Sequence, residues 1–357
     1  MDVSAKITGI KYLPFLCREL KVYNLSDLDT ALSQVGSFIL DLYSKKRIAL
    51  SWWVSPKRTR SYPYARVYDT LSFDGKKVTV IPIMKDEGRD GDRDFLQWDT
   101  ISLMSLLGIY VIIGYYKGAE KSKRYTQKIT NQRFDTQYIK EEINEILSYQ
   151  SDALHWNLSQ TEKVGEIGKT ALYCYEKISK ELGIKMHSKD SAEKRINELL
   201  KGKENFIQFS RELAKKAQSR ESITKQPKEK LSGIKATLTI KNYLGGYYFF
   251  TCDEVEIENE TIYLIEGKHS KQSLLPSLED IKDGLLKMIL FTNLEEVKIE
   301  EKEYKPIAVL KLTCGFRFSK NRLRPSQIEL LKLLKKEARE NNFIVRFNDK
   351  NVTEITL

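Results

Sequence analysis

The sequence predicts a mixed α/β protein with two sheet-containing parts and a helical region between them. Strand-like and helical segments alternate in the first third of the chain, the pattern is helical from about 136 to 217, and strands return after a lysine-rich polar segment at 219–233. We therefore expect an N-terminal α/β domain over 1–135, a helical connector and linker over 136–232, and a second α/β domain over 233–357.

The composition is typical of a globular protein, with 41% hydrophobic and 31% charged residues. No run of eighteen apolar residues occurs, so we expect no membrane span. The first residues, "MDVSAKITGIKYLP", lack the regions of a signal peptide, which favours a cytoplasmic location. The four cysteines and three histidines are scattered, so the sequence indicates neither structural zinc nor a disulfide framework.

Within the first part, three segments have strand composition: 47–54, 76–84 and 109–116. The segment 26–46 has helical spacing and begins with Ser26 as a plausible cap, so it is expected to form one helix. The basic, polar stretch 117–134 follows without a clear period.

The last part is expected to have the order αβββαβαβ, counting the helix before it. Strands are predicted at 234–243, 247–257, 261–270, 305–315 and 343–348, with helices at 277–293 and 325–342. Gly245 and Gly246 suit a turn. Ser277 with Asp280, and Ser326 with Glu329, have the spacing of capping boxes at the starts of the two helices.

Charged residues mark the two ends of the predicted hairpin "CDEVEIENETIYLIEGKHSK" (252–271). Glu266 and Lys268 point to the same side of their strand because side chains alternate. Asp253 and Glu266 are about equally far from the bend near residue 259, so they are expected to be neighbours. These three residues are the candidate catalytic set.

Two neighbouring carboxylates repel each other unless a cation lies between them. Mg²⁺ prefers carboxylate oxygens, polarises phosphate and lowers the pKa of bound water. Asp253 and Glu266 are therefore the expected Mg²⁺ ligands. Lys268 would orient or deprotonate the water, or offset charge developing on the phosphoryl oxygens. The set suits metal-assisted hydrolysis of a phosphodiester.

An acid, a gap of about a dozen residues and then Glu-x-Lys, on an αβββαβ order, resembles the PD-(D/E)XK nuclease superfamily, and the type II restriction endonucleases within it. The resemblance covers roughly residues 190–348, with Cys252 where proline is usual. It implies a restriction-endonuclease-like catalytic core in the C-terminal domain and a companion DNA methyltransferase. Glu254 follows Asp253 directly, so either acid can be the first metal ligand; Val255 and Ile257 on the face of Asp253 favour Asp253.

Basic residues exceed acidic ones by 60 to 49, a formal charge of +11, which favours a polyanionic partner such as DNA. In "SWWVSPKRTRSYPYARVYD" (51–69), cations alternate with aromatic residues that suit phosphate contacts, guanine edges or unpaired bases. The candidate DNA-binding residues are Lys57, Arg58, Arg60 and Arg66. The alternative is a strand and loop with core aromatics and surface cations. The stretch 117–133 is expected to extend the same surface.

The acidic segment "KDEGRDGDRD" (85–94) resembles the start of a calcium loop but lacks its turn glycine and closing glutamate. We expect a solvated loop, with a second metal site or an acidic lid as alternatives.

These features predict a Mg²⁺-dependent, site-specific double-stranded DNA endonuclease of the type II restriction kind, whose N-terminal domain recognises or clamps the duplex. Two symmetric cuts need two active sites, so a homodimer is expected. The alternatives are a structure-specific repair or recombination nuclease of the same superfamily, and a non-catalytic DNA-binding regulatory protein.

Overall fold

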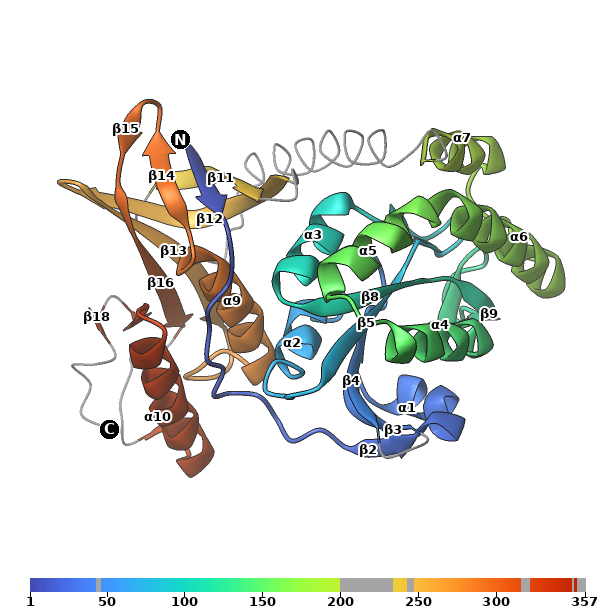
Figure 1. The fold of residues 1–357 in the computed structure, drawn as a ribbon, viewed down its shortest axis with the longest axis horizontal. Coiled ribbons are helices and arrows are strands. Elements are labelled where there is room, and N and C mark those ends of the chain that lie inside the picture. The colour runs from blue at the N-terminus through green and yellow to red at the C-terminus, as the bar shows by residue number, and fades with distance from the viewer. Residues whose placement is uncertain (43–45, 200–233, 243–246, 316–321, 349, 352–357) are drawn as a thin grey trace. The chain divides into compact units, whose positions relative to one another are not determined.

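The computed structural model describes residues 1–42, 46–199, 234–242, 247–315, 322–348 and 350–351 (Figure 1). The chain divides into two compact units: unit 1 is Met1–Glu19 with Leu213–Leu357, and unit 2 is Leu20–Glu212. Both contain helices and sheets, so the predicted mixed α/β class is confirmed. The division differs from the expected boundaries, because the first nineteen residues belong with the C-terminal part.

Unit 1 is built on a nine-stranded sheet in the order β15-β14-β1-β11-β12-β13-β16-β17-β18. Its strands are β1 (Asp2–Ile7), β11 (Ile234–Asn242), β12 (Tyr247–Glu258), β13 (Thr261–Ser270), β14 (Glu295–Ile299), β15 (Lys302–Glu303), β16 (Lys305–Cys314), β17 (Ile344–Phe347) and β18 (Lys350–Asn351). The strands β11, β12 and β13 form an antiparallel meander, and β13, β16 and β17 run parallel.

Two helices belong to unit 1: α9 (Leu278–Phe291) and α10 (Pro325–Glu340). The helix α9 connects β13 to its parallel neighbour through the hairpin β14–β15, and it packs on β13 and β16. Ser277 caps α9 as predicted, because its Oγ accepts the Asp280 N–H at 3.1 Å. The predicted cap of α10 is wrong: Pro325 occupies the first turn, so the helix is capped two residues earlier, at Arg324 with Gln327.

The strand β1 explains why the N-terminus belongs to unit 1. It pairs in parallel with β11 and antiparallel with β14. Its residues alternate: Val3, Ala5 and Ile7 are at most 5% exposed, whereas the residues between them face solvent. The period of two buries one face of the strand, and this pattern places "DVSAKI" in the sheet.

Unit 2 contains a five-stranded sheet in the order β2-β3-β4-β5-β8 and two separate hairpins, β6–β7 and β9–β10. Its strands are β2 (Val22–Asn24), β3 (Ser37–Asp41), β4 (Arg47–Trp52), β5 (Lys76–Pro82), β6 (Met84–Asp86), β7 (Arg93–Phe95), β8 (Ile109–Gly114), β9 (Tyr116–Lys121) and β10 (Ile129–Phe134). Its helices are η1 (Leu25–Asp27), α1 (Leu28–Gln34), α2 (Pro63–Tyr68), α3 (Trp98–Leu106), α4 (Thr136–Ser148), α5 (Ala153–Glu162), α6 (Val164–Leu182) and α7 (Lys189–Leu199).

The strands β4, β5 and β8 run parallel, so the segments that follow them leave from one edge of the sheet. These segments are the loop after Trp52, the hairpin β6–β7 and the hairpin β9–β10. The helices α3, α4 and α5 pack against β8. Ligands of α/β proteins usually bind at this edge of a parallel sheet.

The predicted single helix over 26–46 is wrong. The segment forms η1 and α1, then turns at Val35 and Gly36 and continues as β3. The sequence "SFILD" packs into the sheet core, where Phe38 and Leu40 are fully buried. Sheet burial therefore overrides the helical spacing. The strands predicted at 47–54, 76–84 and 109–116 are present as β4, β5 and β8.

Three predicted segments lie outside the described residues: the linker 219–233, the turn at 245–246 and the helical pattern beyond residue 199. In the part of the chain that the structure describes, no helix is both long and apolar enough to cross a membrane.

Candidate functional site

The three predicted catalytic residues lie together where β12 and β13 pair. Glu254 is paired with Ile265 in the antiparallel register, so Asp253 and Glu266 are the next residues on the two strands. The N–H of Gly267 donates to Asp253 Oδ2 at 2.8 Å, which holds this carboxylate beside the backbone of β13. Lys268 Nζ lies 3.0 Å from Glu266 Oε1.

Glu266 is 2% exposed and each of its carboxylate oxygens contacts one ammonium group. Oε1 faces Lys268, and Oε2 accepts a hydrogen bond from Lys287 of α9 at 2.7 Å. Burial alone would raise the pKa of Glu266, but the charges of Lys287 and Lys268 outweigh it and lower that pKa to about 2. The carboxylate is therefore ionised at neutral pH.

Lys268 bridges two acids. Its Nζ also lies 2.7 Å from Oδ2 of Asp283, one turn before Lys287 on α9. Burial alone would lower the pKa of Lys268, but Glu266 and Asp283 raise it well above its ordinary value. Gly284 allows this close packing: a Cβ there would lie 2.7 Å from Leu310 Cδ1 and 3.2 Å from Lys268 Cε.

Asp253 and Glu254 point to opposite faces of β12 because side chains alternate along a strand. Glu254 is fully buried and lies 3.2 Å from Nζ of Lys311, which is 2% exposed. Asp253 lies on the face of Glu266 and contributes to raising the pKa of Lys287. The geometry therefore favours Asp253 as the ligand, although Ile257, predicted to point inward on its face, is 44% exposed.

The donor chemistry of this site fits Mg²⁺. Carboxylates of Asp253 and Glu266 supply hard oxygen atoms, and Mg²⁺ usually binds through one or two carboxylates while keeping several waters. Within the described ranges, no group of three or more His, Cys, Asp or Glu residues is placed to hold a metal. The site therefore offers two carboxylates, and the ammonium of Lys287 competes with a metal for Glu266.

Two residues of the site, Asp283 and Lys287, were not predicted from the sequence. They are four residues apart, so they share one face of α9 and both reach β13. A signal was present: charged residues interrupt the otherwise apolar segment "IKDGLLKMILF", in which most residues are buried.

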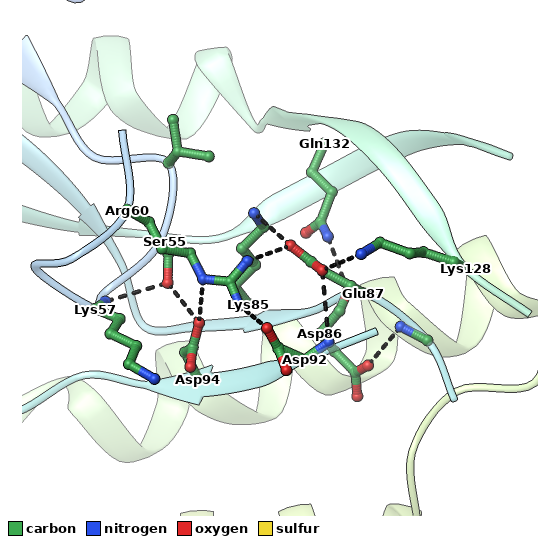
Figure 2. Close-up of polar contacts among 12 residues, drawn as sticks. Ser55, Lys57, Arg60, Lys85, Asp86, Glu87, Asp92, Asp94, Lys128 and Gln132 are labelled. Atoms are coloured by element: carbon green, nitrogen blue, oxygen red, sulfur yellow. Dashed lines mark hydrogen bonds and ion pairs between the residues drawn. The ribbon is translucent and has the colours of Figure 1, made fainter. Parts of the chain in front are cut away.

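The predicted DNA-binding residue Arg60 lies inside an ion-pair cluster of unit 2 (Figure 2). Its guanidinium contacts Asp92, lies 2.9 Å from Glu87 and 3.4 Å from Asp94. Ser55 Oγ donates to Asp94 at 2.8 Å and accepts the N–H of Lys57 at 3.1 Å. Arg60 is thus committed to three acids of its own unit.

Glu87 is the centre of this cluster, as Figure 2 shows. Besides Arg60, it contacts Lys85 at 2.9 Å and Lys128 at 2.8 Å. Burial would raise the pKa of Glu87, but Lys128, Lys85 and Arg60 together lower it to about 2. The predicted solvated loop at 85–94 is therefore wrong at its start, where Lys85, Asp86 and Glu87 are 8%, 3% and 6% exposed. Lys85 and Glu87 compensate each other's burial, and Asp86 contacts Nδ1 of His187 at 2.7 Å.

The remaining predicted DNA-binding residues differ in their surroundings. Arg66 lies over the Trp52 ring at 4.4 Å and donates to the Trp52 carbonyl at 2.9 Å, so it stabilises unit 2 internally. Lys57 is exposed, and Arg58 is partly buried. Among the aromatic residues of the same segment, Trp53, Tyr64 and Tyr68 belong to the core, as the alternative interpretation expected, while Tyr62 is 45% exposed.

Comparison with models of known protein families, with curated proteins and with solved structures finds no match to this chain.

Proposed function

We propose that this chain is a Mg²⁺-dependent, site-specific double-stranded DNA endonuclease of the type II restriction kind, whose active site is formed by Asp253, Glu266 and Lys268. The observation that carries the proposal is the placement of Glu266 and Lys268 on one face of β13, with the Asp253 carboxylate held at the Gly267 amide. The element order β11-β12-β13-α9-β16 around this site, with the hairpin β14–β15 inserted between α9 and β16, supports the proposal because it follows the βββαβ part of the expected order.

In this proposal Asp253 and Glu266 hold the metal ion, which when bound polarises the phosphate and lowers the pKa of a water molecule. Lys268 keeps its charge because two acids surround it, so it supplies a cation to the phosphoryl oxygens as negative charge develops there. Asp283 orients Lys268 from α9. Lys287 balances the charge of Glu266 before the ion binds.

The excess of basic residues supports DNA as the polyanion. Cutting both strands symmetrically needs two active sites, so the proposal includes a homodimer. A companion methyltransferase and a cytoplasmic location complete it.

One observation favours a second candidate, a non-catalytic DNA-binding protein. Both oxygens of Glu266 already have cationic partners within the chain, which is the arrangement of a structural ion-pair network. In that case the cluster would hold α9 against β13 and would have no chemical role.

Incubation of the purified protein with unmethylated phage DNA and Mg²⁺, followed by mapping of the fragment ends, separates the candidates. We expect discrete fragments from the wild type and none from Glu266→Ala, while Glu258→Ala, which removes an exposed acid of β12, should cut normally. Cleavage confined to branched or flapped DNA would support a structure-specific nuclease. Duplex binding without cleavage of any DNA would support the non-catalytic candidate.

A further inference from the structure

The hairpin β9–β10 in unit 2 carries an unusual concentration of positive charge. Residues 117–134 contain six basic side chains and one acidic side chain, Glu120. The two strands form a sheet of their own, separate from the five-stranded sheet. Tyr116 and Phe134 at its base are buried, as is Ile129 at the start of β10, whereas the tip, residues 121–126, is largely exposed.

The six cations fall into two groups. Three of them are paired with acids of unit 2: Lys117 with Asp135 at 3.0 Å, Arg133 with Glu120 at 3.1 Å and Lys128 with Glu87 at 2.8 Å. The other three, Lys121, Lys123 and Arg124, are exposed and have no acidic partner among the residues that the structure describes.

Hydrogen bonds fix the conformation of the tip. Ser122 Oγ accepts the N–H groups of Arg124 at 3.2 Å and Tyr125 at 3.3 Å, and the Ser122 N–H donates to the Lys128 carbonyl at 2.9 Å. Tyr125 is 55% exposed, and the Lys128 ammonium lies 5.5 Å from the centre of its ring. The three cations are therefore presented on a preorganised turn, which lowers the entropy cost of binding.

The end of the loop and the start of β10 are attached to the rest of unit 2. The Gln127 N–H donates to Asp90 Oδ2 at 2.9 Å, and the Ile129 N–H donates to the Glu87 carbonyl at 2.8 Å. Figure 2 shows the side chain of Lys128 reaching from this hairpin to the buried carboxylate of Glu87. Glu87 thus ties the hairpin to the ion-pair cluster.

We propose that the tip of β9–β10, with Lys121, Lys123 and Arg124 as its phosphate-binding residues, is a contact surface for double-stranded DNA. The choice of DNA as the partner rests on the proposed function. A two-stranded antiparallel ribbon fits the major groove, and cations without acidic partners neutralise phosphates without first breaking an ion pair. The exposed Tyr125 hydroxyl suits a further hydrogen bond to phosphate or sugar. Arg60 and Arg66 are less suited to bind phosphate, because Arg60 is paired with acids and Arg66 contacts Trp52 within unit 2.

Fluorescence anisotropy with a labelled duplex, in EDTA so that cleavage does not interfere, tests the proposal across a range of salt concentrations. The test variant is Lys121→Gln/Lys123→Gln/Arg124→Gln. The matched control is Lys169→Gln/Lys177→Gln/Lys180→Gln, which removes the same charge from exposed positions on α6. Urea unfolding should show the same stability for both variants and the wild type.

We expect the log–log salt dependence of the tip variant to be shallower than that of the wild type by about 2 to 3, because each phosphate contact contributes about 0.9. Its affinity at 0.1 M salt should fall on the order of 100-fold, while the α6 variant stays within a few-fold of the wild type. An unchanged slope, or an equal loss in the α6 variant, would overturn the proposal.

A parallel cleavage assay with Mg²⁺ separates failure of this inference from failure of the proposed function. Normal DNA cleavage with an unchanged slope in the tip variant would remove the hairpin from the interface and leave the nuclease in place. A slope change without cleavage by the wild type would keep the DNA surface and remove the nuclease. A wild type that does not bind duplex DNA would overturn the tip proposal and count against the proposed substrate.

Discussion

The ammonium of Lys287 lies 2.7 Å from Oε2 of Glu266 and joins α9 to β13 through a buried ion pair. Lys268 contacts the other oxygen of the same carboxylate, and Asp283 contacts Lys268. Two acids and two lysines thus form a linear chain of ion pairs, from Lys287 through Glu266 and Lys268 to Asp283, in which each charge has an opposite partner.

Replacement of Lys287 by methionine should destabilise unit 1 by about 3 to 5 kcal/mol, because it leaves part of the Glu266 charge buried without a partner. Chemical denaturation at pH 7 in EDTA measures the change in the free energy of unfolding. The control is Lys271→Met, an exposed position that should stay within about 0.5 kcal/mol of the wild type. A Lys287→Met protein as stable as this control would show that the pair does not stabilise the fold.

The lowered pKa of Glu266, about 2 against an ordinary 4.5, predicts how stability depends on pH. Between these values the unfolded chain binds a proton and the folded chain does not. The stabilisation is therefore complete above about pH 4.5 and is lost as the pH falls towards 2, amounting to about 3 kcal/mol. The pKa of Glu87 in unit 2 is also lowered to about 2, so its contribution to stability should be lost over the same pH range.

Unfolding of Glu266→Gln and Glu87→Gln, measured from pH 2 to 6, checks this expectation. Each variant should be less stable than the wild type near neutrality but should lose less of its remaining stability between pH 4.5 and 2. The exposed control Glu258→Gln should follow the wild-type curve. Parallel curves for all four proteins would contradict the assignment of the acid sensitivity to these two buried acids.

The sequence pattern predicted most of unit 1, because its strands follow the hydrophobic period and its turns contain glycine, asparagine and acids. Asn259, at the predicted bend between β12 and β13, has a φ of 56°, which asparagine tolerates better than most residues. Counting residues from this bend along the two strands therefore correctly predicted that Asp253 lies beside Glu266. The membership of β1 was missed, since its partner β11 lies more than two hundred residues away and local patterns carry no information about such pairing.

The features of the two charged clusters that the sequence did not predict depend on tertiary contacts. The positions of Asp283 and Lys287 depend on which face of α9 lies on β13 and β16, and a sequence without its tertiary contacts does not reveal that face. In unit 2 the local run of cations and tyrosines did not reveal that Arg60 is paired with acids about thirty residues later. A run of cations in a sequence therefore predicts a DNA-binding surface only where the fold places no acidic side chains beside those cations.

The two adjacent acids of β12 should respond differently to neutralisation. Glu254→Gln leaves the Lys311 ammonium buried and should cost about 3 to 5 kcal/mol of stability. Asp253→Asn retains an oxygen that accepts the Gly267 N–H, so its stability should change by only about 1 kcal/mol, yet DNA cleavage should be lost. Chemical denaturation and DNA cleavage, measured on both variants, test which of the two acids stabilises the fold and which is needed for cleavage. Loss of cleavage by a stable Glu254→Gln protein would transfer the metal ligand to Glu254.

Lys268 is predicted to act in the chemical step, and its replacement by methionine keeps the packed stem against Gly284 while removing the charge. Cleavage measured in a single turnover with saturating enzyme and Mg²⁺ should slow by about 10²-fold, or about 2.7 kcal/mol of barrier, because the phosphoryl oxygens lose a fixed cation. Asp283→Asn keeps the Lys268 charge and loses only its orientation, so we expect a loss of about tenfold, or roughly 1.4 kcal/mol.

Duplex binding in EDTA should be unchanged in both variants, which separates a chemical role from a binding role. The control Lys271→Met removes a nearby exposed charge beyond the end of β13 and should cut at the wild-type rate. If Lys268→Met also cuts within a few-fold of the wild type, Lys268 acts only as a counter-ion of Glu266 and Asp283. In that case the cluster beneath α9 is a structural ion-pair network, because a cation required at the phosphate cannot be removed without slowing the reaction.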